Sequence, residues 1–271
     1  MKPALIVVGA DKGGVGKTTV SRALLDYLAA KNVLTRAFDT EYPRGTLKRF
    51  YPAVTDVVDV TSTADQMKML DTMYSAGQKV TVLDVRAGQL ATTLKALRDI
   101  GFLDGVRNGD FSFVLLHVLG SSIASLDEIS ETAPFVNDAS YFLVKNFIND
   151  TQFFEWDPQT YASYFRKVRH AGEITIPKLN EMAYEQVELA AMPFASFIGD
   201  QKIDGEPSPH SFVLRGYART WMRQVSAEFD RIGLLGLLDG KGLDRGTFDR
   251  RDPDRQDFGR PDRDDRFSNQ Y

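Results

Sequence analysis

The feature that most constrains this chain is a glycine-rich loop near its beginning, Gly9-Ala10-Asp11-Lys12-Gly13-Gly14-Val15-Gly16-Lys17-Thr18-Thr19. The apolar run 4–8 precedes it directly, and apolar residues at helical spacing follow it from Val20 to Leu28. A strand, a glycine-rich turn and a helix start, in this order, form the context in which a phosphate-binding loop works. The sequence therefore predicts a site for a phosphorylated ligand at the end of the first strand.

Each residue type in this loop suits a phosphate. Glycines let the backbone wrap closely around an anion, and the start of the following helix adds a partial positive charge. Lys17 is expected to reach the β- and γ-phosphates of a nucleotide, and the Thr18 hydroxyl to bind Mg²⁺. The predicted cofactor-binding residues of the loop are Gly13, Gly14, Val15, Gly16, Lys17, Thr18 and Thr19.

The loop departs from the ordinary pattern G-x-x-x-x-G-K-[ST] in two ways. Asp11 stands where the first glycine belongs, and a second lysine, Lys12, comes just before the glycine pair. The segment 12–19 resembles the deviant Walker A motif of the ParA/MinD ATPases, whose relatives include the nitrogenase iron protein and the arsenite-pump ATPases. The resemblance implies a homodimer with ATP at the interface, in which Lys12 acts on the phosphates bound by the other subunit. It also implies slow ATP hydrolysis, stimulated by an adaptor or activator protein.

Composition sets the general class of the protein. A chain of 271 residues, 43% of them hydrophobic, can bury the core of one α/β domain, which we expect over residues 1–238. There is no cysteine, which excludes disulfides and thiolate metal sites, and the net charge of −4 gives no general sign of nucleic-acid binding. No signal peptide or membrane span is visible, so the expected location is the cytoplasm.

Strands and helices alternate along the chain, which predicts an α/β fold of the P-loop NTPase type: a mostly parallel twisted sheet flanked by helices on both faces. The expected strands are 4–8, 35–39, 79–84, 111–119, 140–146 and 174–177. Helices are expected after the loop and over 63–78, 89–100, 180–196 and 211–235. In the helix 63–78, Met67, Leu70 and Tyr74 are expected to fill the core.

Two acidic residues follow the second expected strand. Asp39 ends that strand, and Glu41 comes two residues later, before Tyr42-Pro43-Arg44-Gly45. The resemblance places the switch I segment here, with Asp39 as its first acid and Glu41 as the acid beside the attacking water. Glutamate is one methylene longer than the aspartate of that pattern, and Tyr42 is an insertion. Glu41 either still orients water or gives a more slowly hydrolysing switch, and both acids can instead be ordinary strand-end residues.

Asp84 ends an apolar strand and has the form of a Walker B acid that holds Mg²⁺ through water. The turn after it, 85–89, does not follow the family pattern, so the role of Arg86 stays open between nucleotide, partner chain and no contact.

The resemblance implies base contacts farther along the chain. It places Asn146 against the adenine edge, and Pro177 at the start of a loop along the base; Asn146 as a helix cap or turn residue is the alternative. His117 lies inside an apolar strand and is expected to be a core residue, with no metal implied beyond Mg²⁺. For the aromatic segment 147–156, core packing is favoured over a lid or a partner surface.

The end of the chain carries two further expectations. Arg215, Arg219 and Arg223 share one helix face and form either a non-specific DNA-binding patch or a solvated surface. Residues 239–271 are dominated by Gly, Asp and Arg and are expected to be a disordered tail. A membrane helix is disfavoured because the apolar run 232–238 contains two glycines and is followed by acidic residues.

Two functions fit this sequence. The first is an ATP-binding and hydrolysing dimerisation switch of the ParA/MinD type, which positions or partitions a DNA or protein cargo. The second is an ATP-dependent ligase of the same fold, similar to dethiobiotin or cobyrinic acid synthases. Lys12 favours the switch, because such a ligase needs no lysine delivered across a dimer.

Overall fold

The computed structural model describes residues 2–74, 79–148, 153, 157–168, 171–199 and 208–240. Its centre is a seven-stranded sheet in the order β3-β2-β4-β1-β5-β6-β7, and all its neighbouring strands are parallel. The strands are β1 (Ala4–Gly9), β2 (Thr35–Asp39), β3 (Thr55–Val57), β4 (Val80–Asp84), β5 (Ser112–Leu119), β6 (Ser140–Asn146) and β7 (Ala171–Ile176).

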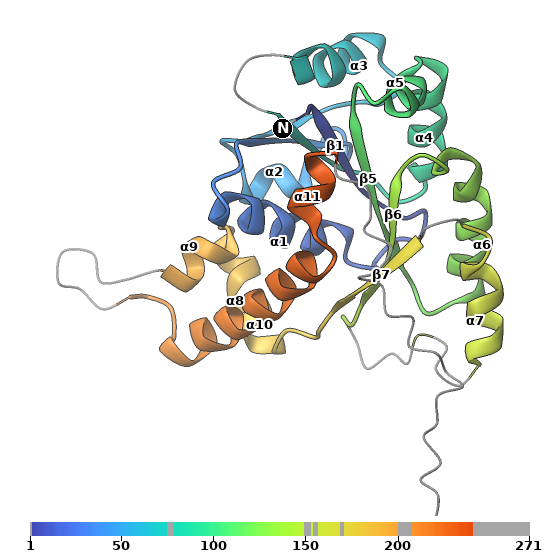
Figure 1. The fold of residues 1–271 in the computed structure, drawn as a ribbon. Helices are drawn as coiled ribbons and strands as arrows, with labels where there is room; N and C mark the ends of the chain where they lie inside the picture. Colours follow the sequence, from blue (N-terminus) through green and yellow to red (C-terminus); the bar gives the residue numbers. More distant parts are fainter. Residues whose placement is uncertain are drawn as a thin grey trace, which may run out of the picture.

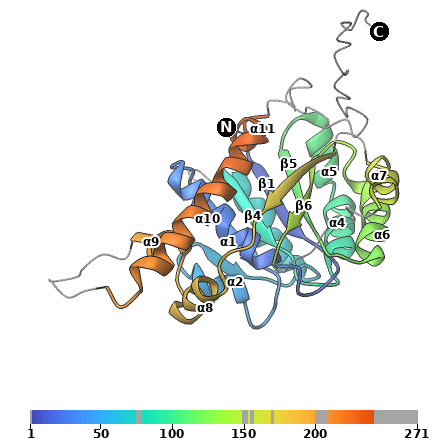
Figure 2. The ribbon, with the colours of Figure 1, turned by 90° about the horizontal axis from the view of Figure 1, so that it is seen from below.

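The central strands are apolar on both sides because helices cover both faces of the sheet. Every residue of β1 and β5 is buried, the pattern expected for parallel strands between two helical layers. One layer contains α1 (Lys17–Ala30), α2 (Thr46–Phe50), α8 (Glu181–Ala190), α9 (Phe194–Gly199), α10 (Phe212–Arg231) and α11 (Leu234–Leu238) (Figure 1). The other contains α3 (Thr63–Leu70), α4 (Leu90–Asp99), α5 (Phe102–Asn108), α6 (Ile123–Thr132) and α7 (Pro158–Phe165) (Figure 2). The predicted architecture, a parallel α/β sheet between two layers of helices, is confirmed.

Strand register brings the predicted acids together. Asp39 at the end of β2 lies directly opposite Asp84 at the end of β4, and Val8 of β1 lies on the other side of Asp84. Parallel strands share the edge at which their carboxyl ends emerge, and ligands of open α/β sheets bind there. The loop after β1 emerges at this same edge.

The helix predicted over 63–78 differs from the prediction in its inner face. It begins at Ser62, whose side chain accepts a hydrogen bond from the Asp65 amide, and it is α-helical only to Leu70 before continuing as a 3-10 helix, η1 (Asp71–Tyr74). This start turns Met69 and Met73 into the core, while Met67 is 57% exposed. Met67 as a core residue was therefore wrong, because the helix buries the face that carries Met69 and leaves Met67 at the surface.

The helix predicted over 180–196 is two helices. Ala191 takes a left-handed conformation at φ 49°, Pro193 follows, and the chain starts again as α9. Proline has no amide hydrogen and cannot continue a helix, so one long element over this range was wrong.

The last predicted helix also divides, because Gly233 is left-handed at φ 65° between α10 and α11. The leucines of α11 pack in the core: Leu234, Leu237 and Leu238 are all buried. The apolar run 232–238 therefore covers the sheet in this fold.

Several short elements escaped the sequence analysis, namely β3 and the helices α5, α6 and α7, whose patterns are brief or half exposed. Phe147 packs edge-on against Phe153, with ring centroids 4.9 Å apart, which places these two rings of the aromatic segment in packed positions. Phe154, Trp156 and the tail 241–271 lie outside the described residues. Within the described ranges, no helix combines the length and the apolar character needed to cross a membrane.

Candidate functional site

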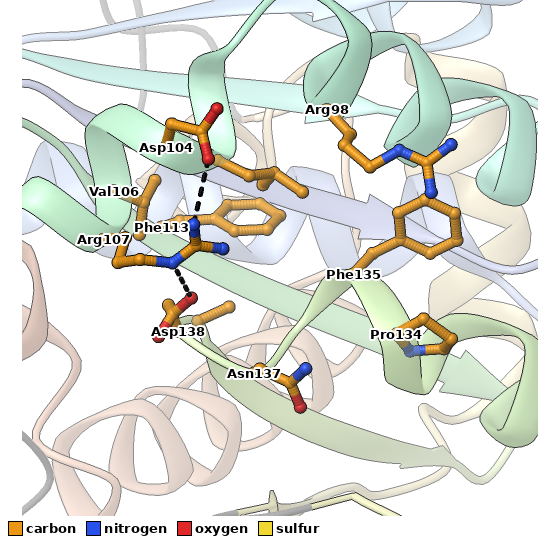
Figure 3. A pocket seen from close by; sticks show the side chains of 11 residues that line it. Arg98, Asp104, Val106, Arg107, Phe113, Pro134, Phe135, Asn137 and Asp138 are labelled. Atoms are coloured by element: carbon orange, nitrogen blue, oxygen red, sulfur yellow. Dashed lines mark hydrogen bonds and ion pairs between the residues drawn. The ribbon is translucent and has the colours of Figure 1, made fainter.

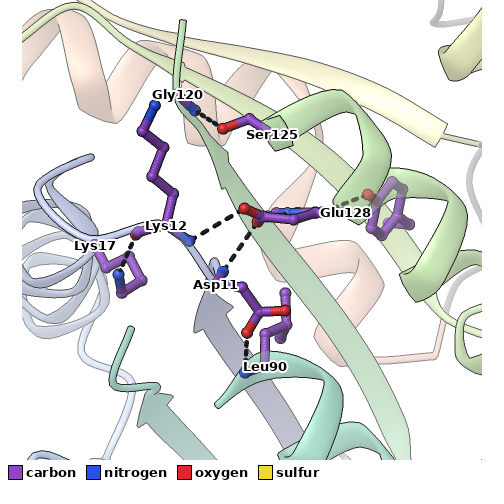
Figure 4. Close-up of polar contacts among 9 residues, drawn as sticks. Asp11, Lys12, Lys17, Leu90, Gly120, Ser125 and Glu128 are labelled. Atoms are coloured by element: carbon purple, nitrogen blue, oxygen red, sulfur yellow. Dashed lines mark hydrogen bonds and ion pairs between the residues drawn. The ribbon is translucent and has the colours of Figure 1, made fainter. Parts of the chain in front are cut away.

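The glycine-rich loop connects β1 to α1 and ends at the helix N-terminus. Gly16 is left-handed at φ 84°, and a Cβ atom there would collide with the Asn146 side chain, so glycine is required on two grounds. Lys17 is the first residue of α1. Its Nζ donates a hydrogen bond to the backbone oxygen of Lys12 at 2.9 Å, which closes the loop on itself (Figure 4).

Lys17 is almost completely buried, with 8% of its surface exposed. Burial lowers the pKa of its ammonium below the ordinary value, and the carboxylates of Asp84 and Glu128 act in the opposite direction. A lysine placed at a helix N-terminus, inside a ring of backbone amides, can contribute a point charge to bound phosphates.

Asp84 receives two hydroxyl groups from the first turn of α1. The Thr18 hydroxyl donates to its Oδ2 and the Ser21 hydroxyl donates to its Oδ1, both at 2.8 Å. The structure therefore brings together the two residues predicted to serve Mg²⁺, although they are far apart in the sequence. Ser21 was missed; its position three residues after Thr18, on the same helix face, is the signal that would have found it.

Asp39 is bound to the backbone of its own segment. Its Oδ1 accepts from the Glu41 amide at 2.9 Å, and its Oδ2 accepts from the amides of Leu47 and Lys48 at 2.6 and 3.3 Å. The latter two amides belong to the first turn of α2, so Asp39 acts as a cap for that helix. The segment that follows β2 is thus attached to the sheet at Asp39.

Glu41 lies half-buried in the same segment and accepts a hydrogen bond from the Thr46 hydroxyl. In this structure its carboxylate is directed to its own turn. A role for Glu41 in positioning water stays a prediction.

Asp39 influences the ionisation of Asp84. Burial raises the pKa of Asp84 to about 7, and the nearby negative charge of Asp39 adds to the effect. Burial also raises the pKa of Asp39, against the lowering effect of its backbone hydrogen bonds. Two buried carboxylates at one sheet edge, with a threonine hydroxyl beside them, form an oxygen-rich donor set that suits a hard divalent cation.

The other flank of the loop is built on Glu128, which the sequence analysis did not identify. The two oxygens of this α6 carboxylate accept hydrogen bonds from the backbone amides of Asp11 and Lys12 at 2.9 and 3.1 Å (Figure 4). Behind it, His117 Nε2 lies 3.2 Å from Glu128, and His117 Nδ1 lies 2.7 Å from the Tyr141 hydroxyl. The core position of His117 is confirmed, and its acid partner lies 11 residues further along the chain.

Asp11 joins this flank to the turn after β4. Its backbone oxygen accepts from the Gly88 amide at 2.8 Å, and its carboxylate accepts from the Leu90 amide, at the start of α4, also at 2.8 Å. The residue that replaces the first glycine of the ordinary pattern is therefore a junction between the phosphate loop, α4 and α6.

The side chain of Lys12 is exposed and lies across the end of β5. Its Nζ donates to the Ser122 hydroxyl, just before α6, at 2.7 Å. Lys12 and Lys17 thus point to different places although they share one loop: the Lys17 ammonium is buried within the loop, and that of Lys12 is at the surface (Figure 4).

The two residues assigned to the nucleotide base have other contacts here. Asn146 Nδ2 donates to the backbone oxygen of Val15 at 3.0 Å, so this side chain supports the phosphate loop. The backbone oxygen of Pro177 accepts from Trp221 Nε1 at 2.6 Å, which ties the end of β7 to α10. Adenine contacts by Asn146 and Pro177 stay predictions.

The arginines of α10 are not equivalent. Arg219 and Arg223 are exposed, whereas Arg215 is half-buried. Arg231, at the end of the helix, is paired with Glu228 at 2.8 Å and also donates to the backbone oxygen of Glu173. Of this set, Arg219 and Arg223 are the side chains most available for a DNA phosphate.

Arg86 has an exposed side chain, and its backbone amide donates to the Thr40 hydroxyl at 2.8 Å. This bond joins the turn after β4 to the segment after β2.

A small cavity of about 170 Å³ lies away from the loop, near the amino ends of β5 and β6 (Figure 3). Its wall includes Arg107, which bridges Asp104 and Asp138, and Arg98, which lies over the ring of Phe135. The charged side chains that line this cavity contact other residues of its wall. None of the predicted site residues lines it.

Comparisons with known proteins give structural neighbours only. No protein-family model matches the chain, and no curated protein matches its sequence. Among solved structures, it is similar to the cell division ATPase MinD of Pyrococcus furiosus, with 15% identity over 84% of this chain and 99% of that one, and a TM-score of 0.49. MinD of Aquifex aeolicus covers 81% of this chain and 97% of its own length at 14% identity, with a TM-score of 0.47. A nucleotide-binding protein of Archaeoglobus fulgidus, in complex with ADP, covers 69% and 86% at 14% identity, with a TM-score of 0.41.

Proposed function

We propose that this protein is an ATP-binding and hydrolysing dimerisation switch of the ParA/MinD type. One observation carries the proposal: Lys17 and Thr18 open α1 at the end of the glycine-rich loop, and the Thr18 hydroxyl is 2.8 Å from the strand-end carboxylate Asp84. This is the arrangement that binds the phosphates of a nucleotide together with a divalent cation. The ligands are ATP and Mg²⁺.

The residues of the site divide the work of phosphoryl transfer. The loop amides and Lys17 bind and orient the phosphates, and Thr18 and Asp84 would hold Mg²⁺, Asp84 through water. When bound, Mg²⁺ neutralises charge on the phosphate oxygens. Asp39 fixes the segment that carries Glu41, and Glu41 orients water for attack on the terminal phosphate.

Lys12 is the residue on which the proposed dimer depends. Its side chain is exposed and its ammonium donates to the Ser122 hydroxyl, so it can leave that partner when another surface approaches. In the proposed dimer, Lys12 of each subunit contacts the phosphates bound by the other and neutralises charge that develops during hydrolysis. Hydrolysis removes the contact and resets the protein to monomers.

Sedimentation with ATP and Mg²⁺ tests this proposal. The parent should form a dimer that dissociates as ATP is consumed, and the Glu41→Ala variant should hydrolyse at least about tenfold more slowly and keep the dimer longer. Lys12→Ala should remain monomeric, whereas Lys95→Ala, which removes an exposed lysine of α4, should behave as the parent. A parent that stays monomeric in ATP, together with unchanged turnover in Lys12→Ala, rules out the switch.

The working surface is proposed separately. Non-specific DNA binding through Arg219 and Arg223 predicts that Arg219→Glu and Arg223→Glu each weaken retention on DNA at fixed low salt, and that salt weakens retention of the parent. Retention equal to that of the parent in both variants excludes these arginines and leaves a protein adaptor as the partner. The proposed location is the cytoplasm.

A further inference from the structure

A buried chain of hydrogen bonds runs from the core to the phosphate loop and plays no part in the nucleotide contacts described above. Tyr141 on β6, His117 on β5 and Glu128 on α6 follow one another at 2.7 and 3.2 Å. Tyr141 and His117 have no exposed surface, and Glu128 is 8% exposed. The chain ends on the amides of Asp11 and Lys12.

Burying a carboxylate is costly unless donors satisfy it, so this position needs an explanation. Burial alone would raise the pKa of Glu128. The His117 ring and the two loop amides more than offset this and hold the pKa below its ordinary value. Glu128 is therefore an ionised group whose two oxygens are both committed to the loop and its support.

Glu128 contacts only the first part of the glycine-rich loop among the described residues, at Asp11 and Lys12. These contacts hold the amides of Asp11 and Lys12, which precede the glycines, and leave the amides from Gly13 onward to a ligand. Asp11 is in turn joined to Gly88 and Leu90, so this part of the loop is anchored to both α6 and α4. The direction in which the Lys12 side chain leaves the backbone is set by this anchored segment.

We infer that Glu128, supported by His117 and Tyr141, is a positioning residue that fixes the backbone of Lys12 so that its ammonium is presented to a second copy of this chain. The inference rests on the proposed function for the role of Lys12. It assigns the two lysines different main supports: Lys17 is the first residue of α1, with its ammonium on the Lys12 backbone oxygen, whereas the backbone of Lys12 is held by Glu128.

Amide hydrogen exchange in the protein without nucleotide tests the anchor by itself. In Glu128→Gln one oxygen is replaced by an NH₂ group that cannot accept, so one of the two amides, that of Asp11 or that of Lys12, loses its acceptor and should exchange at least tenfold faster than in the parent. The Thr40 amide, which donates to the Asp84 backbone on the other flank, should be unchanged, and Glu131→Gln, an exposed glutamate of the same helix, serves as the matched control. Unchanged exchange at Asp11 and Lys12 overturns the inference.

Dimer formation in ATP then tests the link to Lys12. Glu128→Gln should weaken the ATP-dependent dimer at least tenfold, while its affinity for ADP as a monomer changes by less than about threefold, because the phosphates rest on later amides. A loss of ADP affinity as large as the loss of dimerisation overturns the inference, and so does dimerisation equal to that of the parent.

Two outcomes separate this inference from the proposed function. If the parent forms no dimer in ATP, the proposed function fails, and so does the part of the inference that concerns Lys12, while amide exchange still decides the anchor. If Glu128→Gln is unfolded, as faster exchange at Thr40 would show, Tyr141→Phe gives the same readouts from a milder change. Tyr141→Phe should speed amide exchange at Asp11 and Lys12 and leave exchange at Thr40 unchanged. Unchanged exchange at both Asp11 and Lys12 in this variant overturns the inference.

Discussion

The two flanks of the phosphate loop use buried carboxylates in opposite ways. On the β4 side, burial raises the pKa of Asp84 to about 7 and the neighbouring carboxylate of Asp39 adds to the rise, although the hydroxyls of Thr18 and Ser21 donate to Asp84. On the β5 side, Glu128 receives two backbone amides and a histidine ring, which outweigh the effect of burial and lower its pKa. The same functional group lies beside a second acid and receives two hydroxyls on one flank, and receives two backbone amides and a histidine ring on the other.

The difference between the two flanks shows that a buried carboxylate can either fix a backbone conformation or prepare a site for a cation. A carboxylate supplied with rigid backbone donors stabilises a backbone conformation, as Glu128 does. Asp84 lies beside another acid and accepts from hydroxyl groups, which are weaker donors and can rotate away. A bound divalent cation would relieve the repulsion between the Asp84 and Asp39 carboxylates. We therefore expect the Asp84 flank to respond to ligands and the Glu128 flank to remain fixed.

The largest expected effect is on the Asp84 flank. Asp84→Asn removes the charge that serves Mg²⁺ and should lower Mg²⁺-dependent ATP turnover by about 100-fold or more, measured as phosphate release. The free energy of unfolding should not fall, because the variant no longer buries this charge. Asp71→Asn, at an exposed position of η1, is the control, and turnover within threefold of the parent in Asp84→Asn contradicts the comparison.

A smaller effect is expected at Asp39, whose oxygens accept three backbone amides. Asp39→Ala should lower the free energy of unfolding by about 1–2 kcal/mol, because the first turn of α2 loses its cap. It should also lower the pKa of Asp84, since a neighbouring negative charge is gone. Urea denaturation measures the first effect and carboxyl NMR the second; an unchanged Asp84 pKa would show that the two acids do not interact.

Asp26 tests whether burial without a second carboxylate is enough. This residue of α1 accepts from the Ala195 amide at 3.0 Å, and burial raises its pKa to about 6. A raised carboxyl pKa means that the folded state binds the proton more tightly than the unfolded state, so stability rises as pH falls through 6 toward the ordinary value of 3.8. Between pH 7.5 and pH 5 the parent should gain about 1 kcal/mol relative to Asp26→Asn in urea denaturation. Parallel pH profiles of the two proteins would contradict this.

The smallest effect is expected at the far end of the fixed flank. Tyr141→Phe removes the hydroxyl that lies 2.7 Å from His117 Nδ1 and leaves the ring in the core. We expect the free energy of unfolding to fall by about 1 kcal/mol, the usual net value of one hydrogen bond. Tyr217→Phe, at an exposed position of α10, should change it by less, and equal losses in both would mean that this bond does not contribute.

Local patterns were sufficient for the parts of the site that lie at strand ends. Asp39, Asp84 and the glycine-rich loop each follow an apolar run, and parallel strands deliver their carboxyl ends to one edge, so their proximity follows from the α/β pattern. The order of motifs along the chain therefore predicted the contact between Thr18 and Asp84.

Glu128 could not be found in this way, because α6 is short and its sequence shows no pattern that sets this glutamate apart from Glu131 or Asp127. Which acid faces the loop depends on where α6 begins and how it packs on the sheet. The break between α8 and α9 was missed for the opposite reason: a local signal, Pro193, was present but was outweighed by the apolar spacing around it.

By itself, the sequence determined that this chain forms a parallel α/β sheet and that a glycine-rich loop leads into its first helix, because both depend on residues that are neighbours along the chain. Only the tertiary structure decided how the loop is supported, with Asp11 and Lys12 held by Glu128 and the His117 and Tyr141 side chains behind it. These contacts join residues that are 11 to 117 positions apart, and strand register and helix rotation alone set such distances.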